Sequence, residues 1–193
     1  MTSLPELRYS TPAAWTATVM DNFDDFLLDH AAAEKKASGM ALSMIAHYPD
    51  RERIVESMAE LAVEELTHYR EVIRIIQQRK LQLTADTKDG YVLAMRDLIR
   101  QGPEPYFLDR LLTSGVIEAR GCERFGLVAE ALPGGSLKTF YQAITRSEAR
   151  HYALFIELAE LYFDNREVEE RLHQVLRQEA EIAAALDIRS QLH

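Results

Sequence analysis

Residues 61–76 read LAVEELTHYREVIRII, and their apolar positions recur at intervals of three and four, which predicts an amphipathic helix. The apolar stripe of that helix is interrupted in its middle by Glu65 and His68. Side chains three residues apart lie on one face of a helix, so both point toward the expected core. A buried carboxylate without a partner costs several kcal/mol, so this stripe indicates a site as well as a core.

The same interruption recurs in three other stretches. Glu148 and His151 form a second Glu-x-x-His pair, and single glutamates interrupt the stripes that contain Glu34 and Glu118. The spacing also repeats, because Glu34 precedes Glu65 by 31 residues and Glu118 precedes Glu148 by 30. One Glu-x-x-His is common in helices. Two of them, in phase with two partner glutamates, are a specific pattern.

Helical phase separates Glu65 from its neighbour Glu64. The stripe that contains Glu64 also contains Ser57, Glu60 and Glu71, so it is polar. We therefore expect Glu65 in the site and Glu64 in solvent.

Helical periodicity covers most of the chain, and we find no alternating pattern typical of strands. Thr11-Pro12 predicts the start of a short helix, and Asp21 is the expected cap of the next one. Pro49 and Gly102-Pro103 mark breaks. The predicted long helices are 21–48, 50–80, 103–132 and 136–163, with further helices at 89–100 and 165–186. Four long helices with short accessory helices predict an all-α, ferritin-like four-helix bundle. We expect a single domain over 1–193, with its core at about 21–163 and a C-terminal accessory helix at about 165–186.

The composition of the chain excludes several classes of protein. Apolar residues make up 47% of the 193, enough for a sizeable core, and the single Cys122 excludes an internal disulfide or a four-cysteine metal site. The net charge of −9 argues against a general polyanion binder, although not against a local basic patch. Residues 1–7 lack the features of a signal peptide, and no apolar run is long enough to span a membrane, so we expect a soluble, cytoplasmic protein.

The donor set points to a metal centre. One glutamate from each of two helices, with a Glu-x-x-His from each of the other two, is the general ligand pattern of di-iron carboxylate bundles. We therefore predict two iron ions as cofactor, with O2 binding at positions that the protein ligands leave open. Manganese suits similar carboxylate sites and remains an alternative. The predicted ligands are Glu34, Glu65, His68, Glu118, Glu148 and His151.

Four blocks of the sequence resemble the bacterial tRNA hydroxylase family MiaE: Asp29–Ala37, Glu64–His68, Ile117–Phe125 and Ser147–His151. The resemblance extends from about Leu27 to Phe163. It implies a non-haem di-iron monooxygenase that hydroxylates the isopentenyl group of 2-methylthio-N6-isopentenyladenosine in the tRNA anticodon loop, using O2 and external electrons. All six residues that match the iron ligands of the family are present.

Two other functions stay open. A ferritin-like iron-storage or ferroxidase protein shares the ligand pattern, and so does a di-iron oxygenase of a small molecule. The resemblance implies tRNA and an external electron donor as partners, and we expect a monomer or a small homo-oligomer that makes no membrane contact.

Several residues near the ligands have two interpretations. His30, one turn before Glu34, is either a partner of that ligand or an ordinary core histidine. Gly115, Gly121 and Gly126 indicate tight helix packing or a local bulge, and we expect Cys122 to be a buried structural thiol.

Candidate RNA contacts are less specific. Four basic pairs could bind phosphates, and we place the first two on the outer surface: Arg120 and Arg124, Arg146 and Arg150, Arg51 and Arg53, and Arg79 and Lys80. Four aromatic residues near loops could stack on bases: Tyr48, Tyr91, Tyr106 and Phe107.

Overall fold

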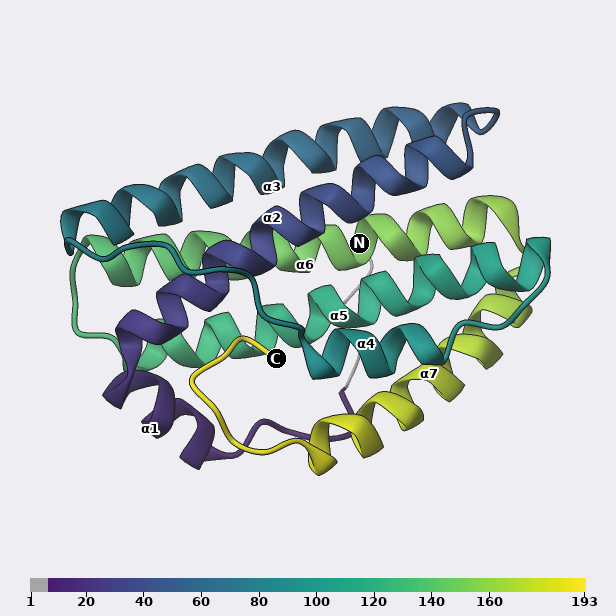
Figure 1. Cartoon of the computed structure of the whole chain (residues 1–193). Helices are drawn as coiled ribbons and strands as arrows, with labels where there is room; N and C mark the ends of the chain where they lie inside the picture. Colours follow the sequence, from purple (N-terminus) through teal and green to yellow (C-terminus); the bar gives the residue numbers. More distant parts are fainter. Residues whose placement is uncertain (1–6) are drawn as a thin grey trace. The chain divides into compact units, whose positions relative to one another are not determined.

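The computed structural model describes residues 7–193, and that part of the chain contains helices and connections but no strand (Figure 1). The predicted all-α class is confirmed. The helices form two compact units. The first, called the α2–α3 unit, comprises Thr18–Thr87 and Arg189–Leu192. The second, called the α5–α6 unit, comprises the described chain up to Ala17 together with Lys88–Ile188 and His193.

The α2–α3 unit is an antiparallel pair of long helices, α2 (Phe23–His47) and α3 (Glu52–Gln78) (Figure 1). The Ser38 hydroxyl donates to the carbonyl of Ala62 at 2.9 Å and ties the helices together. The predicted cap is wrong. Asp21 is the last residue of α1 (Ala13–Asp21), and Asn22 precedes α2 without a side-chain cap. The Asn22 amide donates instead to the Thr18 carbonyl, which closes the end of α1.

The α5–α6 unit is built on a second antiparallel pair, α5 (Pro103–Ala131) and α6 (Ser136–Tyr162) (Figure 1). Two further helices pack against this pair, α4 (Gly90–Asp97) and α7 (Asn165–Ala185). Asp89 and Asp164 cap these helices by accepting hydrogen bonds from backbone amides in the first turn. Gly102 adopts a φ of 101°, a conformation that favours glycine, directly before Pro103 begins α5.

The long helices begin and end within two residues of the predicted positions. Residues 1–6, which contributed to the argument against a signal peptide, lie outside the described residues. Among the described helices, none combines the length and apolar content that a membrane span requires.

A buried carboxylate joins three parts of the α5–α6 unit. Asp109 on α5 accepts hydrogen bonds from Arg171 on α7 at 2.8 Å and from the Arg100 side chain and backbone at 2.8–2.9 Å. Burial alone would raise the pKa of Asp109, but the hydrogen bonds from Arg100 and Arg171 outweigh it, so the pKa lies below the ordinary 3.8.

The lowered pKa of Asp109 predicts a pH-dependent contribution to stability. Because the folded-state pKa lies below the unfolded one, the contribution is complete above pH 3.8 and is lost as the pH falls through the folded pKa. Asp109→Asn should lower the free energy of unfolding by about 2 kcal/mol at pH 7. In urea titrations, the difference from the parent protein should shrink at pH 3. A difference that is equal at both pH values would contradict the prediction.

Candidate metal centre

The α2–α3 unit brings three predicted ligands together. Glu34 lies on α2, and Glu65 and His68 lie one turn apart on α3, all three buried. The Nδ1 atom of His68 is 3.5 Å from Oε2 of Glu34 and 3.5 Å from Oε2 of Glu65. One donor atom from each residue lies within 4.8 Å of the others. This cluster is called the first half-site.

His30 contacts the first half-site directly. Its Nε2 lies 2.6 Å from Oε1 of Glu34, and the side chain is fully buried beside Phe26. Because His30 contacts one carboxylate oxygen of Glu34, it fixes the orientation of that carboxylate, and the other oxygen, Oε2, faces His68. Of the two interpretations of His30, the structure supports the one in which it is a partner of Glu34.

The electrostatics of the first half-site favour a cation. Burial lowers the pKa of His68, but hydrogen bonding to Glu34 and Glu65 raises it by more, to about 10. In this state a proton on the imidazole supplies the positive charge between the two carboxylates. A bound metal ion would supply that charge in its place.

The α5–α6 unit holds the other three predicted ligands. Glu118 lies on α5, and Glu148 and His151 lie one turn apart on α6, all buried. The Nδ1 atom of His151 is 3.9 Å from Oε2 of Glu118 and 3.8 Å from Oε2 of Glu148. This cluster, called the second half-site, has the same composition as the first, and its histidine also faces its carboxylates through Nδ1.

The outward nitrogens of the two histidines face different groups. Nε2 of His68 lies 3.8 Å from Oε1 of Glu64, whose side chain is 38% exposed. Nε2 of His151 lies 3.5 Å from the hydroxyl of Ser147. In each half-site this neighbour precedes the histidine by four residues. Glu64 is partly exposed, as expected, and it also reaches His68, which lies four residues further along the same helix.

The donor set suits a first-row metal such as iron or manganese. Each half-site offers carboxylate oxygens, which are hard ligands, and one imidazole nitrogen. Their burial would be unfavourable without a cation, since ionised carboxylates lose their hydration there. The geometry of each half-site therefore fits the predicted role of its three residues.

The glycines of α5 permit close packing within the second unit. A Cβ atom on Gly115 would lie 3.2 Å from Cβ of Phe155, which is tighter than ordinary contact. A Cβ atom on Gly121 or Gly126 would meet only ordinary contacts, at 3.7 Å and 3.6 Å. Helix α5 continues without a bulge from Pro103 to Ala131. Of the two interpretations, tight helix packing is supported at Gly115.

Cys122 is a buried thiol that donates to the carbonyl of Thr145 at 3.2 Å. Burial, with smaller contributions from Glu148 and Glu123, raises the pKa of the thiol to about 11. Because the thiolate is the reactive form, Cys122 should react with a disulfide reagent at pH 7.5 only at the rate of unfolding. Equal labelling rates in the native protein and in urea would contradict this.

Four of the candidate RNA contacts are buried, so the sequence placed them wrongly. Arg120 and Arg124 are buried rather than on the outer surface, because α7 and the N-terminal segment cover that face of α5. Arg124 lies over the Trp15 ring, 5.0 Å from its centroid. Tyr91 and Phe107 are also buried, so neither can stack on a base. Arg146 and Arg150 are exposed, as expected.

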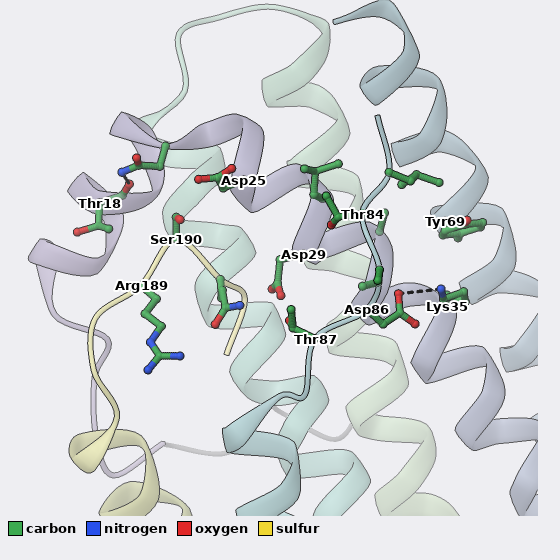
Figure 2. Close-up of a pocket in the computed structure, with 17 residues that line it drawn as sticks. Thr18, Asp25, Asp29, Lys35, Tyr69, Thr84, Asp86, Thr87, Arg189 and Ser190 are labelled. Carbon is green, nitrogen blue, oxygen red and sulfur yellow. Dashed lines mark hydrogen bonds and ion pairs between the residues drawn. The ribbon is translucent and has the colours of Figure 1, made fainter. Parts of the chain in front are cut away.

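The α2–α3 unit also contains a cavity that the sequence did not predict (Figure 2). Its volume is about 550 Å³, and its walls are α2, residues 83–87 and the C-terminal segment 189–191. Lys35 on α2 forms an ion pair with Asp86 at 2.9 Å and so attaches residues 83–87 to α2. Asp29 on α2 accepts a hydrogen bond from the Leu192 amide at 2.7 Å, which attaches the C-terminal segment. None of the six predicted ligands lines this cavity, so it is separate from the half-sites.

A solved structure shares the fold over nearly the whole chain. Protein 43 with aldehyde deformylating oxygenase activity, from Synechococcus, matches with a TM-score of 0.92 and 31% sequence identity. The match covers 98% of this chain and 96% of that chain. The predicted ferritin-like fold is thereby confirmed, and together with the half-sites it defines an all-α protein with buried carboxylate–histidine clusters.

Sequence comparison then gives the family. Residues 3–193 match the family described as tRNA-(MS[2]IO[6]A)-hydroxylase (MiaE), and the chain belongs to this family of tRNA-hydroxylating enzymes. The tRNA 2-(methylsulfanyl)-N(6)-isopentenyladenosine(37) hydroxylase of Pseudomonas putida is 32% identical over 197 residues, covering 100% of this chain and 96% of the relative. The protein of the same description from Salmonella typhimurium is 33% identical over 132 residues, covering 68% of this chain and 48% of the relative.

Proposed function

We propose that this chain is an O2-dependent, non-haem di-iron monooxygenase that hydroxylates the isopentenyl group of 2-methylthio-N6-isopentenyladenosine in the tRNA anticodon loop. The observation that carries the proposal is the matching composition of the two half-sites, each with two glutamates around one histidine. In the proposal the half-sites join around two iron ions, and residues 1–193 act as a single di-iron domain. Membership of the MiaE family supports both the reaction and the substrate.

Iron, when bound, supplies the redox chemistry by which O2 attacks an unactivated C–H bond. One oxygen atom enters the substrate, and the other leaves as water with two protons and two electrons from an external donor. The chain's own residues hold the metal in a buried environment and exclude water from it. His30 fixes the orientation of Glu34 through its 2.6 Å contact.

The substrate implies the partners and the location. With a tRNA substrate, we expect the enzyme in the cytoplasm, and the proposal includes an external electron-donor system and a monomer or small homo-oligomer. The target base must leave its stack to reach the metal, which is easier in an anticodon loop because that loop is already single-stranded.

A nucleoside assay tests the function. Reduced, iron-loaded protein is given O2 and tRNA that carries the isopentenyl modification, and the digested nucleosides are analysed by mass spectrometry. We expect the modified adenosine to gain one oxygen atom. An unchanged nucleoside, in a preparation that consumes O2 and holds two irons per chain, would falsify the assigned substrate.

A small-molecule oxygenase is the second candidate, because Protein 43, which is described as having aldehyde deformylating oxygenase activity, is 31% identical to this chain. A parallel reaction with an aldehyde in place of tRNA distinguishes the two, and turnover of the aldehyde alone would favour this candidate. Sedimentation tests the iron-storage alternative, which requires a large shell. Metal analysis of the active protein separates iron from manganese.

A further inference from the structure

The α5–α6 unit contains a cavity on the surface of α7, at the point where the N-terminal segment passes this helix (Figure 1). Its volume is about 400 Å³, and it is lined by Arg8 from the N-terminal segment and by Glu170, His173, Gln174 and Arg177 from α7. None of the six predicted ligands lines it. In a chain of net charge −9, a cavity lined by two arginines and a histidine, with one acid, is locally basic.

A buried ion pair holds the backbone on both sides of this cavity. The carbonyl of Tyr9, which directly follows Arg8, accepts a hydrogen bond from Arg120 on α5 at 2.8 Å. Arg120 also donates to Glu179 on α7 at 2.8 Å, and both side chains are fully buried. Glu179 lies two residues after Arg177 on the same helix. The ion pair therefore fixes the segment that carries Arg8 beside the part of α7 that carries Arg177.

Two other side chains of the cavity already have partners that leave it rich in donors. Oε1 of Gln174 accepts a hydrogen bond from Nη1 of Arg171 at 3.0 Å, so the amide group of Gln174 is left to donate elsewhere. Glu170 accepts from Nε of Arg166 at 2.8 Å, which offsets the negative charge of this acid. The cavity therefore offers mainly N–H donors, from two guanidinium groups, an imidazole and an amide.

Three of the four basic pairs predicted from the sequence are less suited to binding a phosphate. Arg120 is buried, and Arg53 and Arg79 each lie beside an acid, at 2.5 Å from Glu56 and 2.5 Å from Asp24. Each of these two acids offsets the charge that a phosphate would need. The cavity on α7 was missed because its two arginines come from opposite ends of the chain, so no local pattern joins them.

We propose that Arg8, His173, Gln174 and Arg177, called the α7 phosphate site, bind a phosphate group of the tRNA backbone. The guanidinium group matches the geometry of phosphate oxygens, which it binds through two parallel N–H donors. All four side chains are exposed, so a phosphate that belongs to a long polymer can reach them. The inference rests on the proposed function, because it takes tRNA as the partner. Phosphate contacts orient a nucleic acid without reading its sequence, so this site would set how the tRNA lies on the enzyme.

Binding of RNA is tested on the metal-free protein. The probe is an unmodified anticodon stem-loop RNA with a fluorescent label, and its anisotropy is measured across a series of salt concentrations. Arg8→Ala and Arg177→Ala should each weaken binding severalfold. Because both arginines contact one phosphate, the double variant should reduce the slope of log affinity against log salt by about 0.7–0.9, the amount for one phosphate. Arg53→Ala, which removes an exposed arginine beside an acid, is the matched control and should bind as the parent does. Parental affinity in both single variants would overturn the site.

A gain of binding provides a test that misfolding cannot imitate. Glu170→Gln removes the acid of the cavity and should strengthen RNA binding severalfold. Glu169→Gln removes an exposed acid from the same helix, outside the lining of the cavity, and should change binding much less. Equal gains in the two variants would mean that RNA responds only to net charge, and the site would be overturned.

Inorganic phosphate, as a second probe, distinguishes the tRNA backbone from a free anion. Phosphate replaces chloride at constant ionic strength, and the melting temperatures of the parent and Arg177→Ala are compared. A rise that Arg177→Ala loses, together with unchanged RNA binding in that variant, would assign the cavity to a free anion and overturn the proposal.

The nucleoside assay separates this inference from the proposed function. In that assay Arg177→Ala should raise KM for tRNA and leave kcat unchanged, because the contact is the same in the ground state and the transition state. If the parent does not hydroxylate the nucleoside, the proposed function fails, while the anisotropy measurements still decide whether RNA binds at the α7 phosphate site.

Discussion

Glu65→Ala and His151→Ala should each leave fewer than two irons per chain and reduce hydroxylation by at least about a hundredfold. Both side chains are buried, and each substitution removes one of the three predicted ligands of its half-site. Loss of a residue that merely supports a ligand lowers metal affinity or activity about 10- to 100-fold, so loss of the ligand itself should do more. Iron is measured by metal analysis after gel filtration, and activity by the nucleoside assay.

The control substitutions lie on the same two helices as Glu65 and His151, and each removes an exposed carboxylate. Glu60→Gln on α3 and Glu157→Gln on α6 each remove an exposed carboxylate from the helix that carries the substituted ligand. Both should retain two irons and full activity. Two tightly bound irons in either Glu65→Ala or His151→Ala would show that the residue is not a ligand.

The helices could be predicted from the sequence because their amphipathic pattern is local. Proline and glycine mark the breaks around Pro49 and Gly102, and the spacing of apolar residues defines the helical face between them. The same phase argument selected Glu65 over Glu64, and the structure places Glu65 with Glu34 and His68. The caps were less predictable, since Asp21 and Asn22 are both good capping residues and only the course of the chain chooses between them.

Arg120 was wrongly placed on the surface, because a local sequence pattern does not show which distant segment packs against a helix. Arginine on the face opposite a core stripe normally indicates a solvated surface, and its partner Glu179 lies 59 residues away on α7. A signal was present, since α5 also has apolar residues on other faces, among them Leu112, Val116 and Val128. A helix that is apolar all round is buried on more than one side, so α5 should have been expected to have a covering helix.

The contacts of the two predicted ligand histidines were only partly predictable from the sequence. Ser147 and Glu64 each precede a histidine by four residues, which places them on the same helical face, so their contacts could have been predicted from spacing. The chemical difference between a hydroxyl and a carboxylate at this position has no counterpart in the apolar pattern. This difference can be seen only in the structure, which shows which side chain lies beside Nε2 of each histidine.

Arg120 forms a fully buried ion pair in the α5–α6 unit. Nε of Arg120 donates to Oε1 of Glu179 at 2.8 Å, Nη2 donates to Oε2 at 3.0 Å, and both side chains are fully buried. Arg120 also donates to the carbonyl of Tyr9 at 2.8 Å, and the Tyr91 hydroxyl donates to Glu179 at 3.0 Å. Burial and the neighbouring Glu179 raise the pKa of Tyr91 well above its ordinary value, so the phenol remains a donor. These bonds fix α7 and the N-terminal segment on α5.

Glu179→Ala should lower the free energy of unfolding by about 3–5 kcal/mol, because it leaves the Arg120 guanidinium buried without its main counter-charge. The same substitution removes the acceptor of the Tyr91 hydroxyl. Urea unfolding followed by circular dichroism at pH 7 measures the loss. Glu181→Ala, an exposed acid on the same helix, is the matched control and should change stability by less than about 0.5 kcal/mol.

A double variant separates loss of the ion pair from loss of packing. In Arg120→Met with Glu179→Met, no buried charge is left alone, so the free energy of unfolding should recover part of the deficit of Glu179→Ala. The coupling energy from the cycle of single and double variants should be positive and larger than about 1 kcal/mol, since the residues are in direct contact. Additive losses would mean that Arg120 finds sufficient compensation from Glu123 and the Tyr9 carbonyl. The docking of α7 would then depend on its apolar residues, Val168, Val175 and Leu176, rather than on the ion pair.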